Sequence, residues 1–362
     1  MTDAATLADR LRQTAASERV TPTELSALVS DVFVTCGVPR ADADIAAEVA
    51  VWAQLHGSDS HGAVHLPLYT RGLLDQTIKC QPLFAVKNAM PCCAVIDADN
   101  GLGLVVSQRA VDMAIDMAKT HGLGAVAVRK SSHFGAAGYY AERAAEHGLI
   151  GLAFTNAMPA IAPTGGMHGL FGTNPIGAAF PIPNADPVVA DMATSAVARS
   201  RIRHALAAGQ KAIPEGWALD PTGQSTTDPA VAVKGSLVPI GGPKGYALSL
   251  MVEVLCSTLS DGDPGFQVTY ENMVKRPSNI CQFFLALNPE GFAGAERYGA
   301  RMTHIAERVM SAKAMAGAEP PRLPGSRGHA VKRKAAAEGI GMFDNLRVAL
   351  KNVAGMIENP HP

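Results

Sequence analysis

From about residue 92 onward, short apolar runs alternate with helix-like segments, and this alternation constrains the fold more than any other feature. Several helices are expected in this part, and at 105–120 apolar residues recur at intervals of three and four. This pattern is typical of α/β and α+β proteins. We predict strands at 93–97, 124–129, 149–155, 176–182, 188–192 and 283–287, and helices at 105–120, 136–147, 246–259, 297–315 and 330–353.

The first 90 residues are expected to be mainly helical, after a loosely held leader at 1–20. Thr21-Pro22-Thr23-Glu24 is typical of a helix start, because threonine caps, proline suits the first turn and glutamate favours the positive helix end. That helix is expected to end near Cys36, and two more follow at 41–56 and 64–74. Residues 208–236 are rich in Gly, Pro and Thr and are expected to form a long loop region.

Composition excludes several classes of protein. The 362 residues are enough for two domains, and a charged fraction of 17% against 48% hydrophobic residues argues against long disorder. A net charge of −1 gives no general affinity for nucleic acid or anionic membranes. None of the six cysteines forms a C-x-x-C pair, so we expect buried, reduced thiols. Without a signal sequence or a membrane-length apolar run, we expect a cytoplasmic protein.

Neither a Rossmann fingerprint nor a Walker A sequence is present. A Rossmann loop needs G-x-G-x-x-G between a strand and a helix, because the glycines let the backbone approach a pyrophosphate. Gly101-Leu-Gly103 lacks the third glycine, and Gly122-Leu-Gly124 precedes a strand. A nicotinamide cofactor, if one binds, must therefore be held by another architecture.

Two histidines lie where acid–base chemistry is plausible. His61 sits in the polar turn Ser58-Asp59-Ser60-His61-Gly62, and its ordinary pKa suits proton transfer. The alternative is a histidine that merely caps a helix end. His133 follows a predicted strand and opens a helix, where backbone N–H groups receive anions. A structural histidine is equally compatible with that position.

Other polar positions allow two interpretations each. Asp191 ends an apolar strand, where a carboxylate either orients a catalytic histidine or caps the next turn. Lys244 in Gly241-Gly242-Pro243-Lys244-Gly245 and the basic loop 322–328 either bind anions or form plain solvated turns.

The histidines near this turn also allow a metal-binding interpretation. His56, His61 and His65 are close in sequence, and the last two have the i,i+4 spacing of a helical metal pair. Gly62 weakens such a helix, and the glutamate of H-E-x-x-H is absent. No metal is predicted, and a metal-dependent hydrolase that uses these histidines is kept as an alternative function.

Taken together, the motifs resemble the malate/L-lactate dehydrogenase type 2 family. That family includes ureidoglycolate, sulfolactate and diketogulonate enzymes and the Δ1-piperideine-2-carboxylate/Δ1-pyrroline-2-carboxylate reductases. The likeness runs from about residue 22 to 345 with the order of motifs preserved. The matching stretches are Asp59-Ser60-His61-Gly62, Ala125–Arg129, Ser132–Gly138, Gly172-Thr173-Asn174-Pro175, Asp191–Ser195, Ile213–Ala218, Lys244-Gly245 and Arg322–Gly325.

The resemblance implies an α+β fold (mixed α/β) that is not a Rossmann fold. A central, mostly antiparallel sheet domain would bind the nicotinamide cofactor, with helical lobes at its flanks and a homodimer as the unit. We expect an N-terminal lobe at 1–120, joined by C-terminal helices at 297–362. The sheet domain is expected at 121–296, with an insertion of loops and helix around 200–260.

The resemblance also implies roles for single residues. The chain would be an NAD(P)H-dependent oxidoreductase in which His61 transfers the proton, Ser60 and Asp191 act in relay with it, and His133 is a rival acid–base residue. The cofactor would be NADP or NAD, with NADPH slightly favoured. Implied substrate-binding positions are His65 and Thr155, and implied cofactor contacts are Pro187, Val188, Val189, Ala190, Met192, Ala193, Thr194, Lys244, Gly325, Ser326 and Arg327.

One position departs from the family pattern. The family usually has arginine four residues after the catalytic histidine, where it grips the substrate carboxylate as a bidentate fork. This chain has His65, which cannot form that fork. The substrate is expected to be a small 2-oxo, 2-hydroxy or cyclic 2-imino acid, bound more weakly or with help from Arg71. A non-catalytic nucleotide-binding paralogue is the second alternative function.

Overall fold

The computed structural model describes residues 3–58, 60–268 and 275–360, so Asp59 of the His61 motif lies outside the described residues. The helices are α1 (Ala4–Ala16), α2 (Pro22–Thr35), α3 (Arg40–Leu55), α4 (Leu66–Leu74), α5 (Gly103–His121), α6 (Ala137–Glu146), α7 (Arg199–Ala207), α8 (Pro229–Ala232), α9 (Pro243–Glu253), α11 (Ala295–Met310), α12 (Ser326–Glu338) and α13 (Asp344–Glu358).

The strands are β1 (Arg19–Val20), β2 (Ala85–Met90), β3 (Cys93–Asp97), β4 (Leu123–Ser131), β5 (Ile150–Thr155), β6 (Ile176–Ile182), β7 (Ala185–Met192), β8 (Ala218–Leu219), β9 (Ser225–Thr226), β10 (Ser236–Leu237), β11 (Ile280–Leu287) and β12 (Ile340–Gly341). Short 3₁₀ segments are η1 (Gly62–His65), η3 (Gly265–Gln267) and η4 (Pro289–Gly291), and η2 (Val254–Thr258) is a π-helix that extends α9.

The centre of the molecule is a seven-stranded sheet in the order β2-β3-β4-β11-β5-β6-β7. Only β3 and β4 pair in parallel, and every other neighbouring pair in this sheet is antiparallel. The expectation of a mixed α and β fold with a mostly antiparallel sheet is confirmed. β2 and β3 enter this sheet from the first 120 residues, so it draws strands from both expected regions, and the division at residue 120 stays a proposal.

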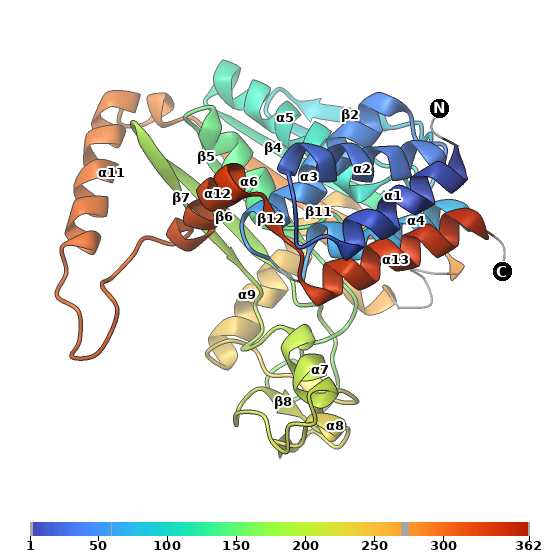
Figure 1. The fold of residues 1–362 in the computed structure, drawn as a ribbon. Coiled ribbons are helices and arrows are strands. Elements are labelled where there is room, and N and C mark those ends of the chain that lie inside the picture. The colour runs from blue at the N-terminus through green and yellow to red at the C-terminus, as the bar shows by residue number, and fades with distance from the viewer. Residues whose placement is uncertain (1–2, 59, 269–274, 361–362) are drawn as a thin grey trace.

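Helices cover both faces of the sheet (Figure 1). α5 and α6 pack on one face, and α9 with η2 packs on the other. Because side chains alternate along a strand, neighbouring residues of β11 enter different cores. Phe284 joins the core under α5 and α6, whereas Phe283 joins the one under η2 with Val252 and Cys256.

The expected leader at 1–20 is wrong for the described residues from Asp3 onward. α1 is an ordered helix whose Leu7, Leu11 and Ala15 are buried, and it lies along α13 (Figure 1). The apolar stripe of α1 is too short to make the helix stable by itself. The helix is stabilised because α13, more than 300 residues away in the sequence, covers that stripe.

Three further expectations are corrected. The helix expected at 330–353 is two helices, because the chain between α12 and α13 forms β12, which pairs with β1. The loop expected at 208–236 contains α8 and three two-residue strands. With α7, these segments surround a small core of Ile202, Ile213, Ala218 and Leu237. The cysteines are free, as expected, but only Cys256 and Cys281 are buried, whereas Cys93 is exposed and the other three are half-buried.

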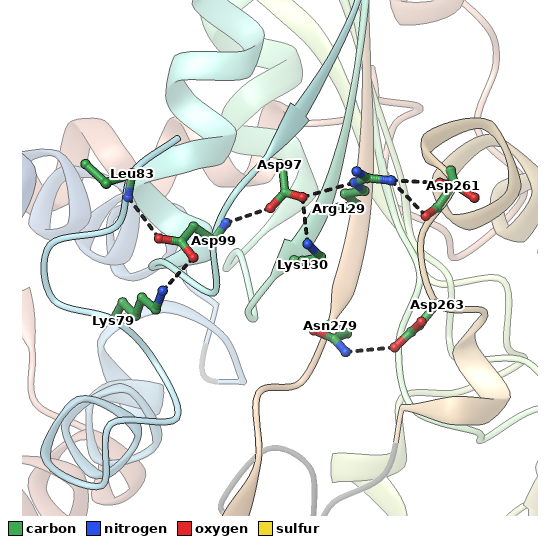
Figure 2. Close-up of polar contacts among 9 residues, drawn as sticks. All are labelled: Lys79, Leu83, Asp97, Asp99, Arg129, Lys130, Asp261, Asp263 and Asn279. Atoms are coloured by element: carbon green, nitrogen blue, oxygen red, sulfur yellow. Dashed lines mark hydrogen bonds and ion pairs between the residues drawn. The ribbon is translucent and has the colours of Figure 1, made fainter. Parts of the chain in front are cut away.

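An ion-pair network fastens the adjacent ends of β3 and β4 (Figure 2). The Asp97 carboxylate accepts hydrogen bonds from Lys130 at 2.8 Å and from Arg129 at 3.2 Å. Arg129 also donates to Asp261 at 2.9 Å, beyond η2. The acidic groups here are paired with cations, so the cluster serves to join chain segments.

None of the described helices is both long enough and apolar enough to cross a bilayer.

Candidate functional site

The turn that carries His61 is held against α3. The buried Gln54 side chain donates to the His61 carbonyl and accepts from the Ala63 N–H, each at 2.9 Å. Gly62 has a φ of +80°, and a Cβ there would lie 2.2 Å from the Ala50 carbonyl oxygen. Glycine is therefore required where the turn approaches α3 so closely. This approach fixes the position of His61 directly before η1.

Three histidines gather at this turn. The His65 and His133 rings stack with centroids 4.8 Å apart, and His61 lies 6.0 Å from His133 and 5.8 Å from His65. The structure therefore brings together two predicted catalytic histidines and the residue that replaces the family arginine.

His133 has a defined proton position. The Gly135 N–H points at its Nδ1 at 3.3 Å, and the Tyr69 hydroxyl lies 2.7 Å from the same atom. Nδ1 is thus an acceptor, which places the ring proton on Nε2. Burial lowers the pKa of His133 well below its ordinary value, and the neighbouring His65 and His61 lower it further. His133 is therefore a neutral ring that offers an N–H.

Tyr69 was missed in the sequence. Burial raises the pKa of its hydroxyl, so it stays a phenol. It lies eight residues after His61 and four after His65 along one helical run, and that spacing was the available signal. A small cavity beside it is lined by Leu68, Thr77, Ile78, Ser132, His133 and Ser278.

His65 does not act as a charged substitute for arginine. Burial lowers the pKa of His65 to about 4, with a further contribution from His61. Its Nδ1 is buried and has no hydrogen-bond partner among the described residues. Arg71, the expected helper, is engaged elsewhere, since it lies 3.5 Å from Asp75 and 3.3 Å from the Pro360 carbonyl.

Replacing His65 by glutamine is expected to flatten the dependence of stability on pH. As the pH falls from 6.5 to 4, the unfolded chain binds a proton at His65 and the folded chain does not, because the pKa of His65 in the folded chain is about 4. The resulting stability is present above pH 6.5 and is lost as pH falls toward 4, by roughly 3 kcal/mol. Urea unfolding of both chains at pH 4, 5, 6 and 7 measures this difference. Parallel curves for the two chains would contradict the assignment.

Ser60 and Asp191 both interact with His61, and their action in relay with it stays a prediction. Ser60 Oγ lies 2.9 Å from His61 Nδ1. Asp191 Oδ2 accepts the Gly138 N–H at 3.0 Å, at the start of α6. Desolvation by the surrounding protein raises the pKa of Asp191, while that N–H and the charge of His61 lower it. Asp191 therefore binds the first turn of α6 rather than the turn that follows it in the chain, and its orienting role toward His61 stays a prediction.

The strand that carries Asp191 also meets the late glycine loop. Val189 donates to the Pro324 carbonyl at 3.1 Å, and His329 Nε2 lies 3.1 Å from the Pro187 carbonyl. Gly325 has a φ of +89°, and a Cβ there would lie 3.0 Å from Val189. Val188 and Ala190 lie on the same strand, and Ser326 and Arg327 open α12 directly after Gly325.

The end of β7 leads to the other predicted anion site. Met192 closes the strand, Ala193 follows, and the Thr194 carbonyl accepts the Ile240 N–H at 2.9 Å. Just beyond, Lys244 is exposed at the second residue of α9. The expected cofactor residues therefore lie along one path that runs from α12 over β7 to α9.

Thr155 stands apart from this group. Its side chain is buried at the end of β5, and its hydroxyl donates to the carbonyls of Asn156 and Cys281 at 2.9 and 3.0 Å. Its contacts join strands, and its role toward a substrate stays a prediction.

The alternative metal site at His56, His61 and His65 is wrong. His56 ends α3 with its ring stacked on Trp52 and its Nε2 facing Glu142. Among the described residues, the potential ligand atoms of His56 gather with those of Glu142 and His329, and not with those of His61 and His65.

Comparisons with known proteins identify the family of the chain. The family described as malate/L-lactate dehydrogenase matches residues 20–351, and the chain belongs to that family. It is 37% identical over 344 residues to a malate dehydrogenase of Pyrococcus abyssi, and the matched region covers 93% of this chain and 94% of the relative. It is 40% identical over 331 residues to an L-sulfolactate dehydrogenase of Methanocaldococcus jannaschii, with 90% and 93% covered.

A relative of different chemistry and a solved structure complete the picture. A Δ1-pyrroline-2-carboxylate/Δ1-piperideine-2-carboxylate reductase of Pseudomonas putida is 34% identical over 340 residues, with 93% and 97% of the chains covered. The solved sulfolactate dehydrogenase of Methanocaldococcus jannaschii superposes with a TM-score of 0.87 at 37% identity, covering 94% of this chain and 97% of that one. The family predicted from the motifs is thereby confirmed.

Proposed function

We propose that this protein transfers a hydride between a nicotinamide cofactor and C2 of a small 2-oxo, 2-hydroxy or cyclic 2-imino acid, with His61 as the proton-transferring residue. As a member of its family it is an NAD(P)-dependent dehydrogenase or reductase, as the sequence predicts. The observation that carries the assignment is the arrangement around His61, with Ser60 at 2.9 Å and Asp191 coupled to it by charge.

The residues on the path from α12 to α9 fit a dinucleotide. The Gly325 turn places the start of α12 against β7, and Gly241 and Gly242 leave open backbone before α9. N–H groups at a helix N-terminus receive anions, so Ser326, Arg327 and Lys244 would hold the phosphates. The cofactor supplies the hydride when it is bound. Exposed cations at both helix starts favour NADPH slightly, and both NAD and NADP are kept.

The chain itself supplies the proton and its control. In the reducing direction His61 gives a proton to the oxygen or nitrogen on C2, through the ring nitrogen that Ser60 does not engage. Asp191 stabilises the imidazolium form of that ring by its negative charge. His133 is the weaker candidate, because its depressed pKa keeps it neutral and its Nδ1 is already an acceptor.

The substrate's acidic group would be met by neutral donors. His65 has a pKa of about 4, and the buried, unpartnered Nδ1 of that ring offers a place for a polar group of the ligand. Neutral rings bind a carboxylate more weakly than an arginine fork. A compact acid with one carboxylate next to C2, such as a simple 2-oxo acid or Δ1-piperideine-2-carboxylate, fits this environment best.

A homodimer is part of the proposal. Leu248, Leu250, Met251, Val254 and Leu259 are exposed along α9 and η2. Large apolar side chains gathered on one surface are typical of protein interfaces. A second copy of this chain is the partner that the family resemblance implies.

The deciding experiment is a reduction assay with a substrate panel. NADPH and NADH are offered separately with pyruvate, oxaloacetate, other 2-oxo acids and Δ1-piperideine-2-carboxylate, and loss of nicotinamide absorbance is followed. We expect turnover with one class of acid, faster with NADPH. Cofactor binding without oxidation of any member would favour the non-catalytic paralogue and would contradict the proposal.

A further inference from the structure

Three ionisable side chains from distant parts of the chain meet inside the protein, away from the proposed proton-transfer group. His56 follows α3, Glu142 lies in α6, and His329 lies in α12. Their side chains are 10%, 5% and 4% exposed. Their potential ligand atoms all lie within 4.8 Å of one another, the one such group among the described histidines, cysteines and carboxylates.

The backbone fixes which ring nitrogens face the centre. His56 Nδ1 lies 2.8 Å from the Trp52 carbonyl, and His329 Nε2 lies 3.1 Å from the Pro187 carbonyl. A carbonyl oxygen only accepts, so both of these nitrogens carry protons. In a neutral ring the other nitrogen is then a lone pair. Those lone pairs, His56 Nε2 and His329 Nδ1, point at the Glu142 carboxylate.

This arrangement lacks a positive charge. His56 Nε2 lies 3.5 Å from Glu142 Oε2, and His329 Nδ1 lies 3.5 Å from Oε1. His56 Nε2 is buried and has no hydrogen-bond partner among the described residues. Two lone pairs and a carboxylate repel one another in a low-dielectric interior unless a cation lies between them.

Two resident cations could fill that role, a proton or a metal ion. A proton shared in a hydrogen bond would bring its donor and acceptor to about 2.7–3.2 Å, whereas both histidine–carboxylate distances are 3.5 Å. Lys332 is 3.9 Å from Glu142 Oε1, beyond hydrogen-bond distance, and 40% of its side chain is exposed. Neither group compensates the buried acceptors directly.

The separations match a metal site better than a hydrogen bond. N–H···O bonds span about 2.7–3.2 Å. Ligand atoms around a tetrahedral Zn²⁺, at about 2.0–2.1 Å from the metal, lie about 3.3–3.4 Å from one another. The two histidine–carboxylate distances are both 3.5 Å.

The outer contacts have the form that metal-ligating histidines need. Each ring donates its other N–H to a backbone carbonyl, which fixes the tautomer and aims the lone pair. The carboxylate accepts the Trp52 indole N–H at 2.5 Å, which holds it in place. Two imidazoles with one carboxylate suit zinc and similar transition metals, whereas Ca²⁺ and Mg²⁺ require oxygen ligands.

We propose that His56, Glu142 and His329 form a binding site for a divalent transition metal of the zinc class, with water as a fourth ligand. The ion would fasten α3, α6 and α12 to one another. Because α12 begins at the Gly325 turn against Val189, it would also hold that turn in place. The sequence predicted no metal, and only His56 of the three was considered there.

Metal titration of the full chain tests this proposal. Protein stripped with a chelator is titrated with Co²⁺, followed by its visible ligand-field bands, and with Zn²⁺ by calorimetry and thermal melting. We expect one equivalent bound and a rise in Tm. Glu142→Gln keeps an oxygen that accepts the Trp52 N–H. Both Glu142→Gln and His329→Gln should weaken metal binding by at least about tenfold. His204→Gln, exposed on α7, is the matched control and should bind as the parent does.

A second variant keeps the test decisive if the buried substitutions fail to fold. Lys332→Met removes a competing cation from the half-exposed rim and should tighten Co²⁺ binding several-fold, because like charges repel. The proposal would be overturned if the protein bound no stoichiometric metal and ¹⁵N spectra at pH 7 showed an imidazolium signal from His56 or His329. That result would indicate a shared proton in place of the metal. Equal metal affinity in the parent and Glu142→Gln would overturn it as well. Neither result depends on the oxidoreductase assignment.

Discussion

Replacing His61 by glutamine is expected to lower kcat by about 10²–10⁴-fold, the range typical of a lost general acid. Glutamine fills a similar volume and keeps polar atoms near Ser60, so the turn held by Gln54 should keep its shape. Affinity for NADPH should change by no more than about twofold, because a group that acts only in the transition state lowers kcat alone. Steady-state rates and fluorescence titration of NADPH measure the two quantities.

His121→Gln is the matched control for that substitution. His121 is exposed at the last residue of α5, far along the chain from the three-histidine group, so its loss should leave kcat unchanged. Full activity in the His61 variant would remove the proton-transfer role from this residue and direct attention to His133. Loss of cofactor binding together with turnover would make His61 a binding residue.

Replacing Phe284 by alanine is expected to destabilise the protein by about 3–5 kcal/mol, the usual cost of emptying a buried aromatic site. Phe284 lies on the central strand β11 and is 0% exposed. Its ring centroid lies 5.3 Å from that of Tyr140 and 6.4 Å from that of Phe134. Both partners belong to the segment from His133 to α6, so the cavity would open beneath the functional site. The free energy of unfolding in urea measures the loss.

Phe292→Ala provides the comparison for the core substitution. That side chain is 72% exposed beyond η4, so the change should stay within about 0.5 kcal/mol. Similar losses for both variants would mean that the core around β11 is not the main source of stability. A loss below about 1 kcal/mol for Phe284→Ala would indicate that the neighbouring rings close the cavity.

Local sequence patterns determined most of the central elements. β3, β4, β5 and β6 begin and end within a few residues of their expected positions, because apolar runs bounded by turn residues define a strand locally. The turn with Ser60 and His61 was equally readable, since its Gly62 and polar residues interrupt two helices. These features depend on neighbours in the chain.

Tertiary structure decided where distant groups meet. Asp191 interacts by charge with His61 only because β7 passes the start of α6, where Gly138 leaves room for the carboxylate. Arg71 was a reasonable carboxylate partner in sequence, but the fold places it against Asp75 and Pro360. No periodicity or motif encodes these distances, because they arise when separate helices and strands pack on one another.

The same division explains α1 and the buried cluster. Residues 4–16 were expected to belong to a loosely held leader, and they form a helix whose apolar side is buried against α13. The chain by itself determined that His56, Glu142 and His329 can bind a proton or a metal. Only the packing of α3, α6 and α12 brought their acceptor atoms within 4.8 Å, because burial and orientation belong to the assembled core and not to any one segment.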